Sequence, residues 1–228
     1  MRVSLPSSSR ATGLWLIGML CVGLGAGGCA THTINLQTGP RAFTADEYEL
    51  VYEGWTRSED DFAWTELDDI LHVTATFESW EFRWAYVARY ARDHSIEESA
   101  RAAMLRATLA DATQHHRFFV TLSGPVFREQ DLTSPRSGWR VLLVDEDGRQ
   151  TTPIEMRKVR HPTAAELIYF PSVSPHRQAF RIVFPARRED GTETIPVDAR
   201  TIKLRFAGAR GQVNLEWEIP TEAAAAAE

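Results

Sequence analysis

Residues 212–219 read Gln-Val-Asn-Leu-Glu-Trp-Glu-Ile, and every second side chain in this stretch is apolar. Successive side chains of a β-strand point to opposite faces, so this pattern is typical of a strand with one buried face and one solvated face. Strands of this kind belong to antiparallel sheets. The stretch therefore indicates an antiparallel β fold.

The same alternation recurs along the chain and predicts more strands. It is found at residues 71–77, 180–184 and 202–206. Residues 139–144 are apolar on both faces, which favours a central strand. Asp147-Gly148 has the chemistry of a hairpin turn and would fold that strand back onto residues 151–158. We expect about six to eight strands packed as two sheets.

One region breaks this pattern and favours helices. Ser95-Ile96-Glu97-Glu98 has the residues of a capping box, which predicts a helix that begins there and runs to about Gln114. Residues 82–90 fit either a helix or the end of a strand, and we favour a helix. The predicted fold is thus mainly β, an antiparallel two-sheet sandwich with a helical insertion around residues 82–116.

Composition and charge limit the classes of function. The chain has 228 residues, of which 43% are hydrophobic, and this is typical of one globular domain. Its formal net charge is -6, and the basic residues are scattered among acids without a polybasic stripe. This excludes nucleic acid as the expected partner. The only cysteines are Cys21 and Cys29, so the folded part is expected to lack disulfides.

The amino terminus has the layout of a secretory signal peptide. A short basic and polar start, residues 1–10, is followed by an uncharged stretch, residues 11–28. The apolar run is interrupted by glycines and is shorter than the roughly 20 residues of a membrane-spanning helix. We therefore expect residues 1–28 to be a signal peptide that is removed.

The stretch that follows, Leu24-Gly25-Ala26-Gly27-Gly28-Cys29-Ala30, places small residues before a cysteine. It resembles the lipobox of bacterial lipoproteins. The resemblance implies a diacylglycerol on the Cys29 thiol, cleavage before Cys29, acyl chains such as palmitate, and an anchor in the cell envelope. Ala30 implies the outer membrane, facing the periplasm. The alternative is that an ordinary peptidase cuts near Ala26 or Ala30 and releases a soluble protein.

The mature chain divides into a tether, a domain and a tail. Residues 29–44 are polar and are expected to form the lipidated cysteine and a flexible tether. Residues 45–220 are expected to form a single domain, and residues 221–228 a disordered tail. In strand order and spacing, residues 118–219 resemble the immunoglobulin-like β-sandwiches of bacterial envelope lipoproteins, a fold that hosts many functions.

Three residues are candidate metal ligands: Asp111, His115 and His116. An Asp and a His four residues apart on one helix face can share a metal ion. The alternative is a histidine that interacts only with the dipole and last carbonyls of its helix. The acidic residues between Glu59 and Asp69 could bind calcium, but a solvated acidic loop with aromatic anchors fits their spacing better.

Four tryptophans are candidates for a ligand-binding surface, because aromatic faces stack on sugars and peptides. They lie in the least regular part of the chain. These residues are Trp55, Trp64, Trp80 and Trp84.

No motif of a catalytic site is found in the sequence, and we expect neither enzymatic activity nor a cofactor. The hypothesis that follows is a membrane-anchored, non-catalytic structural or protein-interaction module with an envelope protein as its partner. The alternative is a ligand- or metal-binding protein that uses residues 52–84 or the His115–His116 pair. A third reading is a hydrolase with a dispersed site that combines Ser123, His161 or His176 with an acid.

Overall fold

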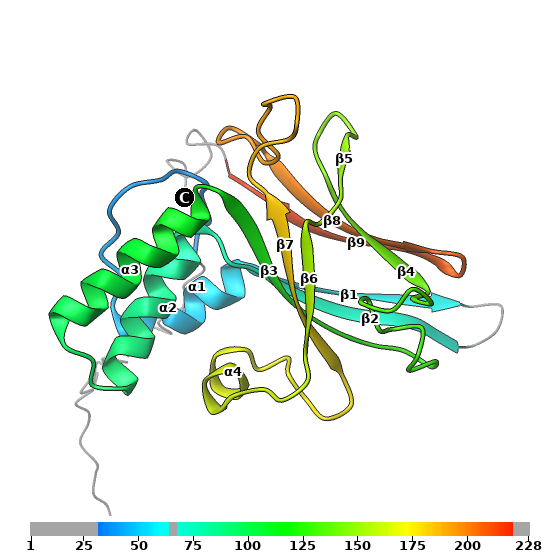
Figure 1. The fold of residues 1–228 in the computed structure, drawn as a ribbon, viewed down its shortest axis with the longest axis horizontal. Coiled ribbons are helices and arrows are strands. Elements are labelled where there is room, and N and C mark those ends of the chain that lie inside the picture. The colour runs from blue at the N-terminus through cyan, green and yellow to red at the C-terminus, as the bar shows by residue number, and fades with distance from the viewer. Residues whose placement is uncertain (1–31, 64–67, 221–228) are drawn as a thin grey trace, which may run out of the picture. The chain divides into compact units, whose positions relative to one another are not determined.

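The computed structural model describes residues 32–63 and 68–220, with only the backbone described for 61–63 and 68–70. The predicted signal peptide, Cys29, Trp64 and the predicted tail lie outside the described residues. The described elements, in chain order, are η1 (Ala45–Glu47), α1 (Tyr48–Gly54), β1 (Thr56–Ala63), β2 (Asp68–Phe77), α2 (Trp80–Asp93), α3 (Glu98–Ala112), β3 (His115–Ser123), β4 (Trp139–Val144), β5 (Gln150–Thr151), β6 (Glu155–Val159), α4 (Ala164–Tyr169), β7 (Gln178–Pro185), β8 (Thr201–Gly208) and β9 (Gly211–Glu218) (Figure 1).

The strands form two antiparallel sheets, which confirms the predicted mainly β class. In the described part of the chain one sheet has the order β1-β2-β3-β7-β6 and the other the order β5-β4-β8-β9. Figure 1 shows α1, α2 and α3 gathered beside one end of the larger sheet, with α4 separate from them. Both long helices, α2 and α3, lie between β2 and β3 in the chain, as the predicted helical insertion requires.

The hairpin of β8 and β9 follows the alternation that its sequence predicts. Leu215 and Trp217 of β9 are fully buried, and Leu204 of β8 is the cross-strand partner of Leu215. Gly208, the last residue of β8, packs closely against the residue before β4, where an added Cβ would come within 2.2 Å of the carbonyl oxygen of Gly138. Only glycine fits there without moving the backbone.

The hairpin at Gly148 is shorter than predicted. Gly148 has a φ of 79°, and β5 pairs with β4 over residues 150–151 only. Pro153 follows and has no N–H to donate to a ladder, which ends the pairing. The chain then crosses to the other sheet, where β6 pairs with β7. The expected return of residues 151–158 onto β4 is therefore wrong beyond Thr151.

Helix α2 resolves the ambiguity of residues 82–90 in favour of a helix. Its N-cap Ser79 accepts a hydrogen bond from the backbone N–H of Phe82. Helix α3 begins later than predicted, because Ser95 adopts a φ of 51° and the N-cap is Glu97. The capping box expected at Ser95 is therefore wrong. Among the described residues, α3 packs chiefly on α2, and none of its side chains is fully buried.

The two sheets share one hydrophobic core. Phe118 of β3 faces the smaller sheet, with its ring 5.6 Å from that of Trp217. Its neighbour Phe119 points the other way and stacks on Phe170 at 4.0 Å, just after α4. The larger sheet therefore buries both faces at β3, one against the smaller sheet and one against α4 and the aromatic residues of α1 and α2.

Two expectations about the amino-terminal half need correction. The acidic stretch after Trp55 was expected to be a loop, but it forms β1, which pairs with β2. Residues 32–44 were expected to be a flexible tether, but Ile34 is 4% exposed and the segment is packed on the domain. No helix among the described residues is long and apolar enough to cross a membrane.

Candidate functional site

A buried carboxylate on α2 holds the amino-terminal segment in place. Glu81 is 2% exposed, and its Oε1 accepts a hydrogen bond of 2.8 Å from the side-chain amide of Asn35. Its Oε2 contacts Nε2 of His32 at 3.1 Å, and Arg41 lies 3.4 Å from Oε1. A buried carboxylate needs such partners to offset its lost hydration. Glu81 therefore fastens residues 32–41 to the start of α2.

Trp55 belongs to the same buried cluster. It is fully buried, and its indole N–H donates to Oε2 of Glu81 at 3.3 Å. Its backbone carbonyl accepts a hydrogen bond of 2.9 Å from the indole of Trp217. Trp55 is thus a core residue that links the two sheets, and its expected place on a ligand-binding surface is wrong.

Of the other candidate tryptophans, the structure describes Trp80 and Trp84, both on α2 and partly buried. The indole of Trp80 donates to the carbonyl of Gly39 at 2.7 Å. The indole nitrogen of Trp84 is buried and finds no hydrogen-bond partner among the described residues. The described candidate tryptophans therefore pack against the rest of the domain, and Trp80 also bonds to the 32–41 segment. They do not form one exposed aromatic face.

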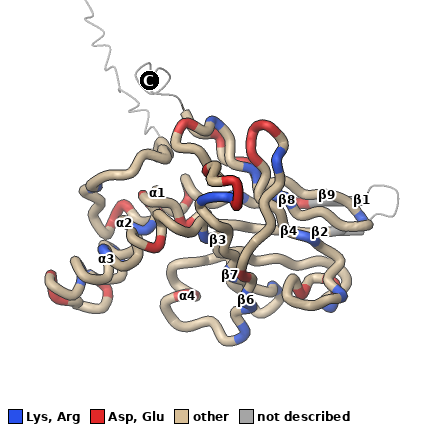
Figure 2. The backbone as a smooth tube through the Cα atoms, turned by 45° about the horizontal axis from the view of Figure 1, so that its top comes forward, with Lys and Arg blue, Asp and Glu red and all other residues tan. Residues whose placement is uncertain are grey.

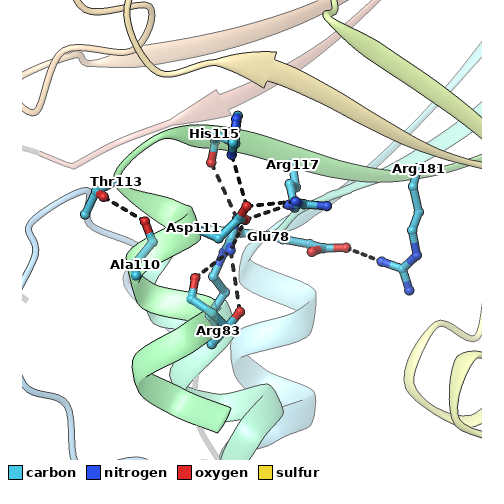
Figure 3. Close-up of polar contacts among 9 residues, drawn as sticks. Glu78, Arg83, Ala110, Asp111, Thr113, His115, Arg117 and Arg181 are labelled. Atoms are coloured by element: carbon cyan, nitrogen blue, oxygen red, sulfur yellow. Dashed lines mark hydrogen bonds and ion pairs between the residues drawn. The ribbon is translucent and has the colours of Figure 1, made fainter. Parts of the chain in front are cut away.

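Asp111, at the end of α3, is the centre of a cationic network (Figure 3). Its carboxylate accepts two hydrogen bonds from Arg117, at 2.6 and 2.7 Å, and one from Arg83 at 2.7 Å. His115 adds a contact of 3.0 Å through Nδ1. Burial alone would raise the pKa of Asp111, but the hydrogen bonds from Arg117 and Arg83 outweigh it and hold the pKa well below its usual value.

The contacts of Arg83 indicate that this network stabilises the fold. Its side chain is 3% exposed, and it also donates to the carbonyl of Thr108 at 2.7 Å and of Glu78 at 2.9 Å. The guanidinium therefore joins α2, α3 and the start of β3 through one buried charge. Asp111 supplies the compensating charge, and both of its carboxylate oxygens already accept hydrogen bonds from arginines. They are therefore not available as metal ligands.

A second observation argues against the candidate metal site. His115 and His116 are not in the last turn of a helix, because α3 ends at Ala112 and both histidines lie in β3. Neighbouring residues of a strand point to opposite faces. His115 accordingly faces Asp111, while His116 lies against the ring of Phe77 at 5.9 Å. Among the described residues no group of three or more His, Cys, Asp or Glu side chains could hold a metal ion.

His116 is the most perturbed histidine of the described chain. Its Nε2 atom is buried and has no hydrogen-bond partner among the described residues. Burial, followed by the nearby charges of Arg83 and His115, lowers the pKa of His116 from 6.5 to about 4. The imidazole is therefore neutral at pH 7.

Arg181 of β7 forms the second charged centre in Figure 3. It pairs with Glu78 at 2.8 Å and with Glu166 of α4 at 3.0 Å. Its guanidinium also lies 5.1 Å from the ring centroid of Phe119, a cation–π distance. These contacts tie α4 to the outer face of the larger sheet.

A third polar group lies farther along the same face. Asp60, His72 and Ser123 occupy one row across β1, β2 and β3, so an acid, a histidine and a serine are neighbours. Asp60 contacts Nδ1 of His72, and Arg177 donates to Nε2 of that ring. The Nε2 lone pair is thus used by a guanidinium and is not free to accept the Ser123 proton. This row is not arranged as a nucleophile with its base.

Arg177 borders a groove at the open edge of the larger sheet. The groove has a volume of about 430 Å³ and lies at the end of β6. Figure 2 shows basic positions at β6 and in the turn that follows it. Its lining combines apolar and basic side chains, among them Phe127, Lys158, Arg160, Leu167, Val173 and Arg177.

Sequence reasoning missed Glu81, Arg83, Arg181 and the groove, because each depends on contacts between residues far apart in the chain. Within the described part of the chain, neither His161 nor His176, the histidines of the suggested dispersed hydrolase, forms a hydrogen bond or ion pair with an acidic side chain. Comparisons with family models, with curated proteins and with solved structures found no match.

Proposed function

We propose that this chain is an exported lipoprotein of the bacterial cell envelope, anchored through lipid on Cys29, whose domain is a non-catalytic protein-interaction module. The observation that carries the proposal is the position of Cys29. The cysteine ends a lipobox-like stretch, and the packed domain begins at His32, only three residues later. A cysteine so placed joins the anchor to the domain through a very short connection.

The fold of the domain supports a structural or adhesive role. We infer an immunoglobulin-like β-sandwich, because the order β2-β3-β7-β6 corresponds to strands A-B-E-D of that fold and β5-β4-β8-β9 to C′-C-F-G. On this assignment β1 is an additional strand beside A, and α2 and α3 are an insertion between A and B. Function is not fixed by such a fold and has to come from its surfaces.

The charged groups of the domain support a non-catalytic role. Asp111 and Glu81 are saturated by arginine, histidine and amide partners, and the ring nitrogens of His72 are both in use. These groups stabilise the junctions between helices and sheets. The surface at the β6 edge, with its groove, is one part of the described domain that is open to a partner.

The anchor is tested by membrane fractionation of the full chain in a bacterial host. Wild-type protein is compared with Cys29→Ala and with Cys21→Ala, a matched control because Cys21 lies in the segment expected to be removed. The proposal predicts that wild type and Cys21→Ala sediment with membranes and that Cys29→Ala does not. Equal distribution of all three proteins would refute the anchor and would leave a secreted soluble protein.

A further inference from the structure

Exposed apolar side chains are concentrated at one edge of the larger sheet. Phe127 is 60% exposed and Leu167 52%, and both line the groove beside β6. Ile154, immediately before β6, is 59% exposed, and Ile168 of α4 is 62% exposed. Ile154 and Ile168 do not line the groove, but they extend the exposed apolar surface along β6 and α4. A contiguous exposed apolar surface marks a binding site more often than scattered side chains do.

The same edge carries positive charge that the domain does not neutralise. Arg157, Arg160 and Arg177 form no ion pair with a carboxylate in the described residues, whereas Lys158 is paired with Asp131 at 2.9 Å. This contrasts with the arginines of the domain interior, which are matched to acids. In a chain of net charge -6, an unpaired basic cluster is complementary to an acidic partner.

The backbone of β6 is also open. Strand β6 is the last strand of its sheet, with β7 as its only strand neighbour among the described residues. An edge strand presents unpaired N–H and C=O groups, and an extended peptide can add to it as a further strand. Such addition supplies main-chain hydrogen bonds, while adjacent pockets select the side chains.

We propose that the β6 edge, with its groove between Phe127, Leu167 and Arg177, binds an extended acidic segment of a partner protein by strand addition. Apolar side chains of the segment enter the groove, and its carboxylates meet Arg157 and Arg160. This inference deepens the proposed protein-interaction function by naming the chemistry of the partner. It does not depend on the lipid anchor.

The shape of the surface favours a peptide over a lipid bilayer. A pocket of about 430 Å³ accepts inserted side chains, whereas a bilayer surface would cover protruding groups. Arg177 is also positioned by contacts of its guanidinium with Thr74, at 3.2 Å, and with His72. A fixed guanidinium suits recognition of a carboxylate at one place.

The test measures binding of fluorescent peptides to the full-length mature protein in neutral detergent by fluorescence anisotropy. The probe is a short peptide of alternating glutamate and valine. Three control peptides change one property each: lysine replaces glutamate, serine replaces valine, or alternate backbone nitrogens are methylated. The protein variants are Arg157→Glu and Arg160→Glu, made singly and together, and Arg140→Glu, which matches each single variant as a charge reversal at an exposed arginine of β4 in the other sheet.

The proposal predicts that the acidic probe binds and that all three control peptides bind at least about tenfold more weakly. The Arg157/Arg160 variant should lose about tenfold in affinity, and Arg140→Glu should leave it unchanged. No binding of the acidic probe, equal binding of the basic or methylated peptide, or an equal loss in Arg140→Glu would overturn the proposal.

An anionic membrane is the competing occupant of this edge, and a separate experiment tests it. Cys29→Ala protein, which carries no anchor in the proposed account, is mixed with phosphatidylglycerol vesicles. Vesicle binding that depends on Arg157 and Arg160, together with failure of the peptide to bind, would assign the edge to lipid and overturn the peptide proposal. Loss of membrane association in Cys29→Ala with intact peptide binding would support both proposals separately.

Discussion

His116 should make the stability of the domain sensitive to mild acid. Its pKa is about 4 in the folded protein, against 6.5 for an ordinary histidine, because it is buried against Phe77 near the Arg83 charge. Below pH 6.5 His116 is therefore protonated in the unfolded chain but still neutral in the folded chain. The free energy of unfolding consequently falls as the pH falls from 6.5 towards 4. Above 6.5 both states are neutral, and the effect is absent.

The expected magnitude follows from the two pKa values. Between pH 7.5 and pH 4.5 the linkage relation gives a loss of about 2.5 kcal/mol in the free energy of unfolding from this one group. Protonation of Asp111 contributes at lower pH, because its pKa is held well below the usual value. The two effects therefore occupy different pH ranges.

The assay is urea unfolding at both pH values for wild type and for His116→Phe, a change that keeps an aromatic ring beside Phe77 and removes the titration. Other titrating groups, including His72, contribute equally to both proteins and cancel in the difference. We expect the variant to lose about 2.5 kcal/mol less than wild type on acidification. If both proteins lost the same stability, the reasoning about His116 would be refuted.

Three other changes should destabilise the domain by different mechanisms. Glu81→Gln removes the buried charge that fastens residues 32–41, so we expect a loss of about 1–3 kcal/mol in urea unfolding and faster hydrogen exchange in that segment; protection equal to wild type would contradict the anchoring role. Asp111→Asn leaves the Arg83 charge buried without its partner, and calorimetry should show a loss of about 3–5 kcal/mol in the free energy of unfolding. A free energy of unfolding equal to that of wild type would contradict the stabilising role of the Asp111 network. Gly208→Ala places a Cβ 2.2 Å from the carbonyl oxygen of Gly138, and thermal melting should show a loss of about 1–3 kcal/mol. An unchanged melting temperature would show that the backbone beside β4 can move aside.

The sheets could be predicted because their signal is local. Alternation at residues 212–219 and 202–206 reports which face of each strand is buried, and the structure has strands at both places. The first turn of α3 was predicted less well, because the capping pattern at Ser95 competes with a turn that gives that residue a positive φ. The strand β1 was missed because its acidic residues are poor strand formers.

The charged clusters could not be predicted, since they depend on long-range contacts. Arg83 and Asp111 are 28 residues apart, and Glu81 and Asn35 are 46 apart. The spacing of Asp111 and His115 did predict their contact, at 3.0 Å. It predicted the wrong chemistry, however, because the strand turns His116 to the other face and two arginines occupy the carboxylate.

The groove at β6 shows a different limit of sequence reasoning. Arg157, Arg160 and Arg177 look like scattered surface charges in the sequence. Arg160 and Arg177 line the same groove, because Pro153 ends the hairpin with β4 and the chain changes sheets, which places β6 at an open edge next to the residues that precede β7. Open edges arise from topology, so the alternation pattern alone does not reveal them.

The central claim is that Cys29 carries the lipid that holds this domain at a membrane. Its most direct test is the intact mass and amino-terminal residue of the mature protein purified from bacterial membranes. The account predicts a chain that begins at Cys29 and whose mass exceeds that of residues 29–228 by the diacylglycerol and any added acyl chain. An unmodified mass, or a chain that begins at another residue, would contradict it.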